Sequence, residues 1–154
     1  MTQHELHVAD LIRKAFTGVV LGDGIGLWEA QGIDDYEDKK TIADYRAKDE
    51  TGDWLRISVE VLDRCYSSPS FFDADGMRFH LPAFLIADLE GTAQTAGILF
   101  HLVHLPDGME SRFDLLSTDQ RNAVREFLLL RLSDDNYEFE RPRIESALRD
   151  YWSR

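Results

Sequence analysis

Apolar residues recur at helical spacing along the first part of the chain. The positions with this spacing are Val8, Leu11, Ile12, Ala15 and Phe16. Spacing of i, i+3, i+4, i+7 and i+8 places side chains on one face of a helix. Thr2 and Glu5 precede them in a capping-box pattern, in which the hydroxyl and the carboxylate satisfy each other's backbone N–H groups. The sequence therefore predicts an N-terminal amphipathic helix.

The C-terminal third contains signals for two further helices. Ser117 and Gln120 form a second capping box, which predicts a helix that continues to about Leu132. The last helix is expected to start near Pro142, since proline fits the first turn of a helix. Its apolar face follows the same spacing and comprises Ile144, Ala147, Leu148, Tyr151 and Trp152.

The central stretch, residues 67–90, combines high apolar content with turn signals. Residues 73–76 read Asp-Ala-Asp-Gly, which predicts a tight turn. Proline disfavours helix in the preceding residue and fits the first helical turn, so a buried helix is expected over residues 82–89, closed by Gly91. A short β-hairpin around residues 71–80 is the alternative for the segment before Pro82.

Two further segments are ambiguous between helix and strand. Residues 54–65 alternate as in a strand but also fit a helix, and Ser58 favours a helix over residues 58–66 by offering a cap. Residues 98–105 are nearly all apolar, and periodicity does not distinguish helix from strand there. A helix is also expected over residues 41–48. The predicted fold class is mainly α, a single compact domain over residues 1–154 with about six to seven helices.

Charge and composition limit the function classes. The chain has 154 residues, 44% of them apolar, and a net charge of −12. A strongly acidic protein is a poor match for nucleic acid or for an anionic membrane surface. The single cysteine, Cys65, excludes an internal disulfide framework. With no secretory apolar segment near the start and no long apolar run, the expected class is a cytoplasmic protein of bacterial type.

Acidic residues cluster in two nearby groups, with aromatic residues between them. The first group is Asp34, Asp35, Tyr36, Glu37 and Asp38, and the second is Asp49, Glu50 and Asp53. Aromatic anchors beside charges are common at protein interfaces. We therefore predict that these eight residues form a docking surface for a basic protein partner; a solvated face is the alternative interpretation.

No catalytic motif is complete in the sequence. The glycines Gly22, Gly24 and Gly26 resemble a nucleotide loop only faintly, because the remaining fingerprint residues are missing. No cofactor and no metal are predicted. The main alternative to a binding protein is a small metal-assisted hydrolase that uses His80, His101 and His104. A homodimer is a further possibility.

Four short motifs stand out in the chain: residues 26–30 (GLWEA), residues 78–85 (RFHLPAFL), residues 116–121 (LSTDQR) and Tyr151-Trp152. Together they resemble a family of small uncharacterised bacterial proteins, a domain-of-unknown-function family with a Phe-His-Leu-Pro-Ala-aromatic-Leu core. The resemblance covers about residues 26–152 and supplies no catalytic residues. It implies an immunity or accessory protein of the kind found beside secreted toxins. The leading expectation is a non-enzymatic, cytoplasmic immunity protein that neutralises a basic toxin, such as a nuclease, through its acidic face.

Overall fold

Eight α-helices and five short helical turns, with no strand, make up the computed structural model, which describes residues 1–154. The helices are α1 (Gln3–Ala15), α2 (Leu27–Asp34), α3 (Lys39–Lys48), α4 (Val59–Arg64), α5 (Ala74–Glu90), α6 (Leu99–Val103), α7 (Thr118–Leu132) and α8 (Arg141–Ala147). The turns are η1 (Trp54–Arg56), η2 (Ser68–Ser70), η3 (Glu110–Phe113), η4 (Asp135–Tyr137) and η5 (Leu148–Trp152), the last a π-helical continuation of α8. The mainly α fold class is confirmed, with eight helices.

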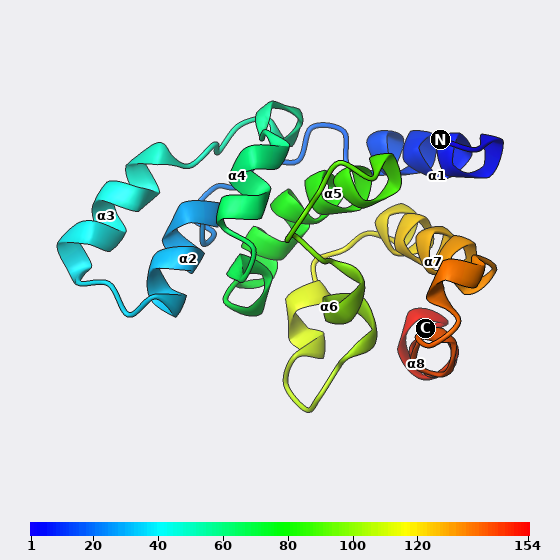
Figure 1. The fold of residues 1–154 in the computed structure, drawn as a ribbon. Helices are drawn as coiled ribbons and strands as arrows, with labels where there is room; N and C mark the ends of the chain where they lie inside the picture. The colour runs from blue at the N-terminus through cyan, green and yellow to red at the C-terminus, as the bar shows by residue number, and fades with distance from the viewer.

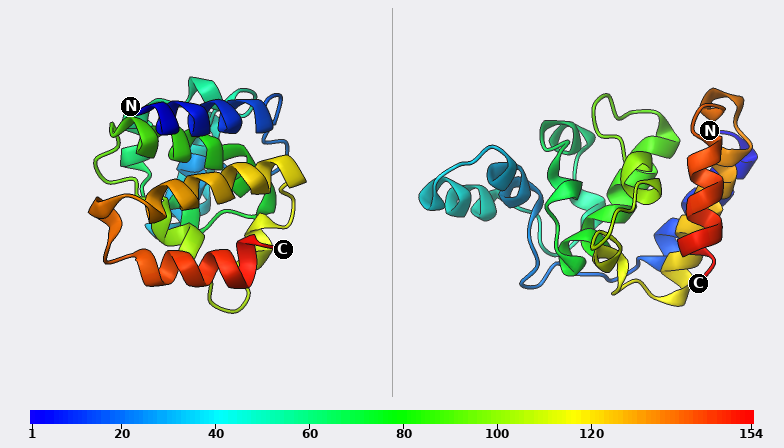
Figure 2. Two further views of the ribbon diagram at one scale, coloured as in Figure 1. Left: turned by 90° about the vertical axis from the view of Figure 1, so that its right-hand side faces the viewer. Right: turned by 90° about the horizontal axis from the view of Figure 1, so that it is seen from below.

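The helices are arranged in three layers. Helices α1, α7 and α8 lie side by side at one end of the molecule, together with both chain termini (Figures 1 and 2). Helix α5 runs through the middle layer, accompanied by α4 and α6. The α2–α3 pair forms a helical hairpin that extends from the opposite end (Figure 2, right). The hairpin is therefore the part of the chain most available to another molecule.

The central helix corrects the prediction for residues 67–90. Helix α5 begins at Ala74, eight residues before Pro82, and runs without interruption to Glu90. Asp73 is its N-cap and accepts the N–H of Gly76 at 2.8 Å, so the Asp-Ala-Asp-Gly sequence starts a helix instead of closing a turn. The β-hairpin considered for residues 71–80 is absent. Gly91 ends the helix in the left-handed conformation, as predicted.

Burial explains why α5 continues through Pro82. A proline in a helix interior costs about 3 kcal/mol, because it removes one hydrogen bond and clashes with the preceding turn. Eleven of the seventeen residues in α5 are buried, among them Phe79, Leu81, Phe84 and Leu85. Full burial of one such side chain contributes roughly 1.5–3 kcal/mol. The apolar contacts of several residues therefore outweigh the cost of the proline.

The helix starts that were predicted from local capping residues are found in the structure. Both capping boxes are formed: Thr2 with Glu5 at α1, and Ser117 with Gln120 at α7. Ser58 caps α4 by accepting the N–H of Val61 at 3.3 Å. The ambiguous segment at residues 98–105 forms a helix, α6. None of the eight helices combines the length and apolar character needed to cross a membrane.

The core reaches all three layers and includes polar anchors. Two buried tryptophans bridge distant elements: Trp152 donates its indole N–H to the carbonyl of Leu102 at 2.9 Å, and Trp54 donates to that of Phe16 at 3.0 Å. Arg131 is buried in α7 and pairs with Asp88 of α5 at 2.6 Å. The Arg131–Asp88 pair fixes α7 against α5, whereas the two tryptophan bonds join η5 to α6 and η1 to the end of α1.

Candidate functional site

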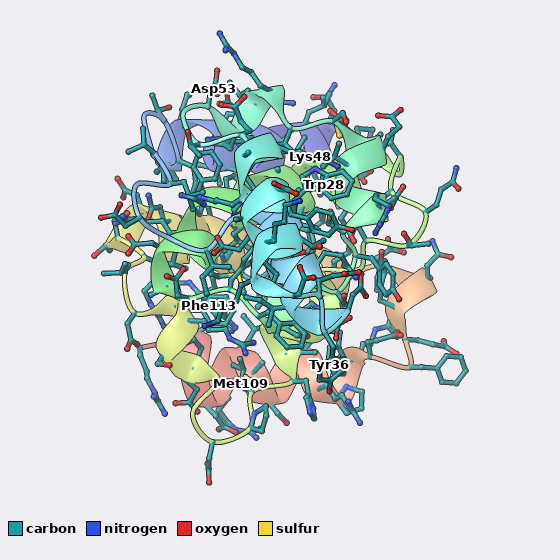
Figure 3. The ribbon with its side chains drawn as sticks, turned by 90° about the vertical axis from the view of Figure 1, so that its left-hand side faces the viewer. Trp28, Tyr36, Lys48, Asp53, Met109 and Phe113 are labelled. Atoms are coloured by element: carbon teal, nitrogen blue, oxygen red, sulfur yellow. The ribbon has the colours of Figure 1, made fainter.

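The first predicted acidic group forms the turn at the far end of the α2–α3 hairpin. We call residues 34–38 the acidic tip. Tyr36 lies at this end of the hairpin, whereas Trp28 and Lys48 lie at the other (Figure 3). Tyr36 is 94% exposed, and the side chains of Asp35 and Glu37 are exposed beside it. The tip therefore presents an aromatic ring between two carboxylates.

Three acids of the tip have partners within the chain. Asp38 is the N-cap of α3 and accepts the N–H of Thr41 at 2.8 Å, a bond that lowers the pKa of the Asp38 carboxyl. Asp34 is half-buried and accepts the hydroxyl of Ser67 at 2.7 Å. Asp35 accepts the side-chain N–H of Gln31 at 3.2 Å, a bond at the end of α2, so Asp35 and Glu37 can contact another molecule without breaking a cap or a tie to the body.

The backbone of Tyr36 is in an unfavourable conformation. Its φ of 57° is the one positive φ in the chain outside glycine. The turn is a Schellman motif: Glu37 donates its N–H to the carbonyl of Gly32 at 3.0 Å, and Tyr36 donates to that of Ile33 at 3.2 Å. Glycine is the usual residue at this position, because a side chain there costs roughly 1–2 kcal/mol. The exposed ring of Tyr36 does not recover this cost by packing within the molecule.

The second predicted acidic group is used for local structure. Glu50 accepts the N–H groups of Gly52 and Asp53, and Asp53 accepts the N–H of Leu55 at 3.0 Å as the cap of η1. Asp49 accepts the N–H of Trp28 at 2.6 Å. The sequence analysis treated the two acidic groups as one docking surface. In the structure the first group forms the exposed tip, whereas the acids of the second group accept backbone N–H groups.

Asp49 provides the N-terminal cap of α2 from a distant position in the chain. Its carboxylate accepts the N–H groups of both Trp28 and Glu29, the second and third residues of the helix. The N-cap residue itself is Gly26, and a Cβ there would collide with the Asp49 carboxylate. The carboxylate thus occupies the place where the side chain of an ordinary N-cap residue would lie.

Burial dominates the ionisation of Asp49. Removal from water raises the pKa of its carboxyl to about 6, against the opposing effects of the Trp28 and Glu29 N–H groups and of the Arg46 guanidinium. Desolvation disfavours the charged form, whereas donated hydrogen bonds favour it. Asp49 therefore changes charge in a weakly acidic range.

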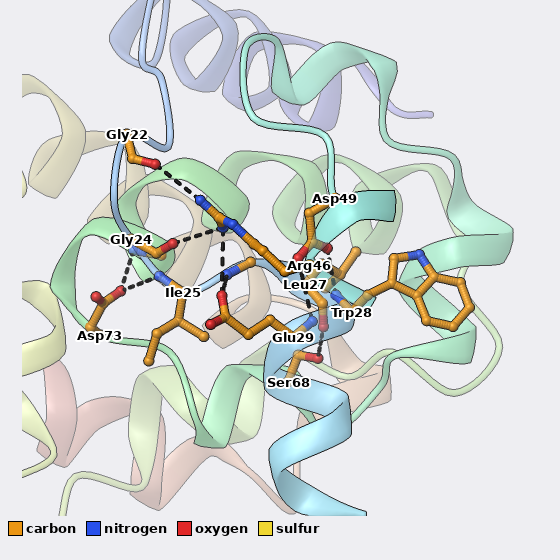
Figure 4. Close-up of polar contacts among 12 residues, drawn as sticks. Gly22, Gly24, Ile25, Leu27, Trp28, Glu29, Arg46, Asp49, Ser68 and Asp73 are labelled. Atoms are coloured by element: carbon orange, nitrogen blue, oxygen red, sulfur yellow. Dashed lines mark hydrogen bonds and ion pairs between the residues drawn. The ribbon is translucent and has the colours of Figure 1, made fainter. Parts of the chain in front are cut away.

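Arg46 ties the hairpin to the glycine-containing loop before it. The guanidinium donates to the carbonyls of Gly24 at 2.9 Å and Gly22 at 3.1 Å, and lies 3.5 Å from the Glu29 carboxylate (Figure 4). A Cβ at Gly24 would approach the Cβ of Asp75 to 2.6 Å. These glycines therefore allow close packing against α5 and expose carbonyls to Arg46, and the loop is tightly held.

The three candidate histidines do not converge. His80 lies in one cavity, whereas His101 and His104 line another, together with Phe100 and Arg112. Burial lowers the pKa of His101 to about 4. No group of three or more His, Cys, Asp or Glu side chains is placed to hold a metal ion. The donor set of the hydrolase hypothesis is therefore not assembled.

His80 nevertheless has an unusual environment. It is fully buried, stacks on Phe72 at 4.5 Å between ring centroids and meets Phe79 edge-on at 4.9 Å. Its Nδ1 lies 2.7 Å from the carbonyl of Gly76, while its Nε2 has no hydrogen-bond partner. Burial lowers its pKa to about 4, so the ring is neutral. A buried polar atom left unpaired costs about 1–3 kcal/mol.

The cavity that His80 lines has a volume of about 250 Å³ and lies at the start of α2. Leu27, Trp28, Ile57 and Val61 supply apolar walls, and Lys48, Asp49, Glu50, Arg56 and Ser58 supply polar groups. Lys48 is positioned over the Trp28 ring, with its Nζ 4.7 Å from the centroid. The cavity thus combines cationic, acidic and aromatic groups, and His80 lies buried behind its wall.

The thiol has no sign of reactivity. Cys65 is completely buried, and burial raises its pKa to about 12. Because the thiolate is the reactive species, a cysteine with this pKa stays protonated and inert near neutral pH. Cys65 is therefore part of the apolar core.

Sequence reasoning did not predict that Trp28, Lys48 and Arg56 line one cavity. They are far apart in the chain, and only Trp28 belongs to one of the motifs named from the sequence. The sequence did contain one signal for the role of Asp49. Gly26 directly precedes α2 and has no side chain that could cap the helix. Such a start requires a cap from elsewhere, and an acid such as Asp49 was a candidate for that role.

The fold and these sites define a single all-helical domain with an acidic projecting hairpin and a small polar cavity. The chain belongs to a family of unknown function, DUF6714, whose model matches residues 3–154. No curated protein and no solved structure matches the chain significantly. The family membership confirms the resemblance inferred from the sequence and assigns no activity.

Proposed function

We propose that this protein is a non-enzymatic binding protein whose acidic tip docks a basic protein partner. The single observation that carries the proposal is Tyr36, which is 94% exposed in a left-handed conformation. Unrelieved backbone strain in a folded protein is a basis for a functional hypothesis. Contact of the tyrosine ring with a partner would recover the cost that the isolated chain does not.

Electrostatics supports the choice of a basic partner. The net charge of −12 attracts a cationic protein over distance and speeds its association. Asp35 and Glu37 are exposed on either side of Tyr36 and can pair with lysine or arginine side chains. Tyrosine is one of the residues that most often contribute strongly to binding energy at interfaces. The tip thus combines an aromatic ring that can anchor a partner with carboxylates that favour a basic one.

In its most concrete form, the proposal is a cytoplasmic immunity protein that neutralises a basic toxin such as a nuclease. An immunity protein needs a preformed surface and no catalytic centre of its own. The capped ends of α2 and α3 hold the acidic tip in one conformation, which limits the entropy lost on binding. The acidic composition and the resemblance to small accessory proteins support the same interpretation.

The test uses toxin-like basic proteins encoded beside the gene for this chain. Each is titrated against the wild type and against a variant with Asp35→Lys, Glu37→Lys and Tyr36→Ala, with calorimetry as the measurement. We expect the variant to bind about 100-fold more weakly or worse, since one aromatic anchor and two charge reversals are combined. Asp34 and Asp38 are left unchanged because they support the hairpin.

The matched control reverses two exposed acids away from the tip, Asp107→Lys and Glu145→Lys. Two reversals add four charges in both variants, so the net charge changes from −12 to −8 in each. Unchanged binding in the control and weakened binding in the tip variant would support the proposal. Equal affinity of the tip variant and the wild type would refute it. Sizing chromatography of each protein separates partner binding from homodimer formation.

A further inference from the structure

Two phenylalanines are exposed at one place on the helical body. Phe139 is 88% exposed and Phe100 is 54% exposed, whereas the other seven phenylalanines of the chain are buried or half-buried. Phe100 lies in α6 and Phe139 lies in the connection between η4 and α8, yet both line the same cavity. A phenylalanine ring has no polar atom that contact with water would satisfy. Two exposed rings at one cavity therefore mark a candidate interaction surface.

The cavity between these rings is formed by α6 and the start of α8, two helices that pack against each other. Its volume is about 450 Å³, and Leu99, Val103 and Tyr137 supply further apolar walls. We call the cavity and its two exposed rings the phenylalanine face. Helix α8 lies at the end of the molecule opposite the α2–α3 hairpin (Figure 2). The phenylalanine face is therefore separate from the acidic tip.

The charges on the phenylalanine face are balanced and unpaired. Glu140 and Arg143 line the cavity and are exposed, and neither forms an ion pair within the chain. The other charged residue of the lining, Asp88, is already paired with Arg131 at 2.6 Å. The face thus offers one free carboxylate and one free guanidinium, although the chain as a whole carries a net charge of −12. Two copies of this acidic chain can meet here without an excess of like charge.

These features are complementary to themselves. In a dimer with two-fold symmetry, every contact from one copy to the other is repeated in the opposite direction. A projecting ring beside a cavity, and a free acid beside a free base, can therefore be matched in both copies at once. A basic partner protein would instead bring like charge to Arg143. The balance of charges thus favours a second copy of the chain as the occupant of this face.

We infer that the chain forms a homodimer through the phenylalanine face. The ring of Phe139 in each copy would reach into the cavity of the other copy, against Leu99 and Val103. Glu140 of each copy would pair with Arg143 of the other. Because α8 lies opposite the hairpin, both acidic tips would stay exposed, and the dimer would present two of them. Aromatic and arginine side chains are enriched at interfaces of this kind.

Sedimentation velocity of the intact chain over a wide range of concentrations tests the dimer. We expect the wild type to change reversibly from the monomer mass of 17.7 kDa toward twice that mass. Phe139→Ala should weaken self-association about tenfold or more, because the ring is lost twice in each dimer. Its circular dichroism should match that of the wild type, since the ring is 88% exposed. The matched control is Leu55→Ala, which removes a side chain that is 64% exposed on η1 and should leave self-association unchanged.

Charge exchange tests the two-fold arrangement itself. Glu140→Arg leaves two arginines on the face, and Arg143→Glu leaves two glutamates. Each variant alone should associate more weakly than the wild type, because like charges then meet across the symmetry axis. An equal mixture of the two variants should form a heterodimer, since every arginine then faces a glutamate. Non-specific association of apolar surfaces would not produce this recovery.

Three results would overturn the inference: a wild type that stays monomeric, an unaffected Phe139→Ala variant, or a mixture of charge variants that does not recover. Weaker binding of the basic partner by Phe139→Ala, with self-association unchanged, would assign the face to that partner and would also overturn it. The dimer and the proposed function can fail independently, because residues 34–38 do not line this cavity. The tip variant should therefore dimerise like the wild type.

Discussion

The helical body and the α2–α3 hairpin are stabilised in different ways. Helix α5 buries eleven of its seventeen residues, whereas α3 has no buried residue at all. The body is held by apolar burial across α1, α5 and α7. The hairpin buries less, chiefly Leu27 and Ala30 of α2, and is held in addition by hydrogen bonds at its base, where Arg46 reaches two carbonyls and Asp49 caps α2.

The difference indicates which region can change without loss of the fold. An intramolecular hydrogen bond contributes about 0.5–1.5 kcal/mol net, and a fully buried phenylalanine about 1.5–3 kcal/mol. The hairpin is therefore expected to open locally at a lower free energy than the body. The proposed docking surface lies at the tip of the hairpin, so the body serves mainly as its scaffold.

The largest expected effect comes from the body. Phe127→Ala removes a fully buried ring from α7 and should lower the free energy of unfolding by about 3–5 kcal/mol. Ile42→Ala in α3 removes a half-buried side chain and should cost less than about 2 kcal/mol. Urea denaturation monitored by circular dichroism measures both. Similar losses would contradict the contrast between the two regions.

Removal of the Arg46 tether should act mainly on the hairpin. Arg46→Gln deletes two charge-assisted bonds to carbonyls, so we expect a loss of about 1–3 kcal/mol. Hydrogen exchange should show faster exchange in residues 27–48, while α5 and α7 keep their protection. The matched control is Arg143→Gln on exposed α8, which should leave exchange in residues 27–48 unchanged. Uniform acceleration throughout the chain would mean that the hairpin and the body unfold together.

Asp49 gives the hairpin base a distinctive pH dependence. Burial raises its pKa to about 6 from an ordinary value of 3.8, so the folded state favours the protonated form. This contribution to stability is present below pH 3.8 and is lost as the pH rises through about 6.

The check is the difference in unfolding free energy between wild type and Asp49→Asn, measured by urea denaturation from pH 4 to 7. We expect the wild type to lose stability relative to the variant over this range. The comparison cancels other acids such as Asp63, whose pKa is lowered by the N–H groups of Thr95, Ala96 and Gln94 and which therefore acts in the opposite direction. A difference that stays constant with pH would show that burial of Asp49 does not control its ionisation.

The smallest predicted effect has the opposite sign. Tyr36→Gly relieves the left-handed backbone at the acidic tip and should raise stability by about 0.5–1 kcal/mol. The gain is smaller than the full relief of strain, because glycine has more entropy in the unfolded chain and this opposes it. Thermal denaturation measures the gain. Tyr36→Ala keeps a Cβ and should show no such increase. A stabilised Tyr36→Gly variant that binds the partner less well would link the strain to function.

The sequence predicted the elements whose signals are local. The capping boxes at Thr2 and Ser117 and the cap at Ser58 are formed because the hydroxyl and its backbone partner are three residues apart. The apolar faces of α1 and of the last helix, α8 with η5, were also identified, because helical periodicity places them on one side. These interactions are largely complete within a single turn, so they require little knowledge of the rest of the fold.

Other features depended on distant parts of the chain. Whether Pro82 begins α5 or lies within it was decided by burial on several sides of the helix. The acids 34–53 looked like one surface, but Asp49 caps a helix that begins more than twenty residues before it. His80 looked like one of three possible ligands, and only the tertiary structure separated it from His101 and His104.

The amino-acid pattern alone thus determined the helical class, most helix starts and the acidic character of residues 34–38. The packed chain decided which acids remained exposed, how α5 passes its proline and which atom of His80 was left without a partner. The physical reason is range: caps and helix periodicity are short-range properties. Burial and remote hydrogen bonds, such as that of Asp73 to the N–H of Ile25, exist only after segments far apart in sequence have come together.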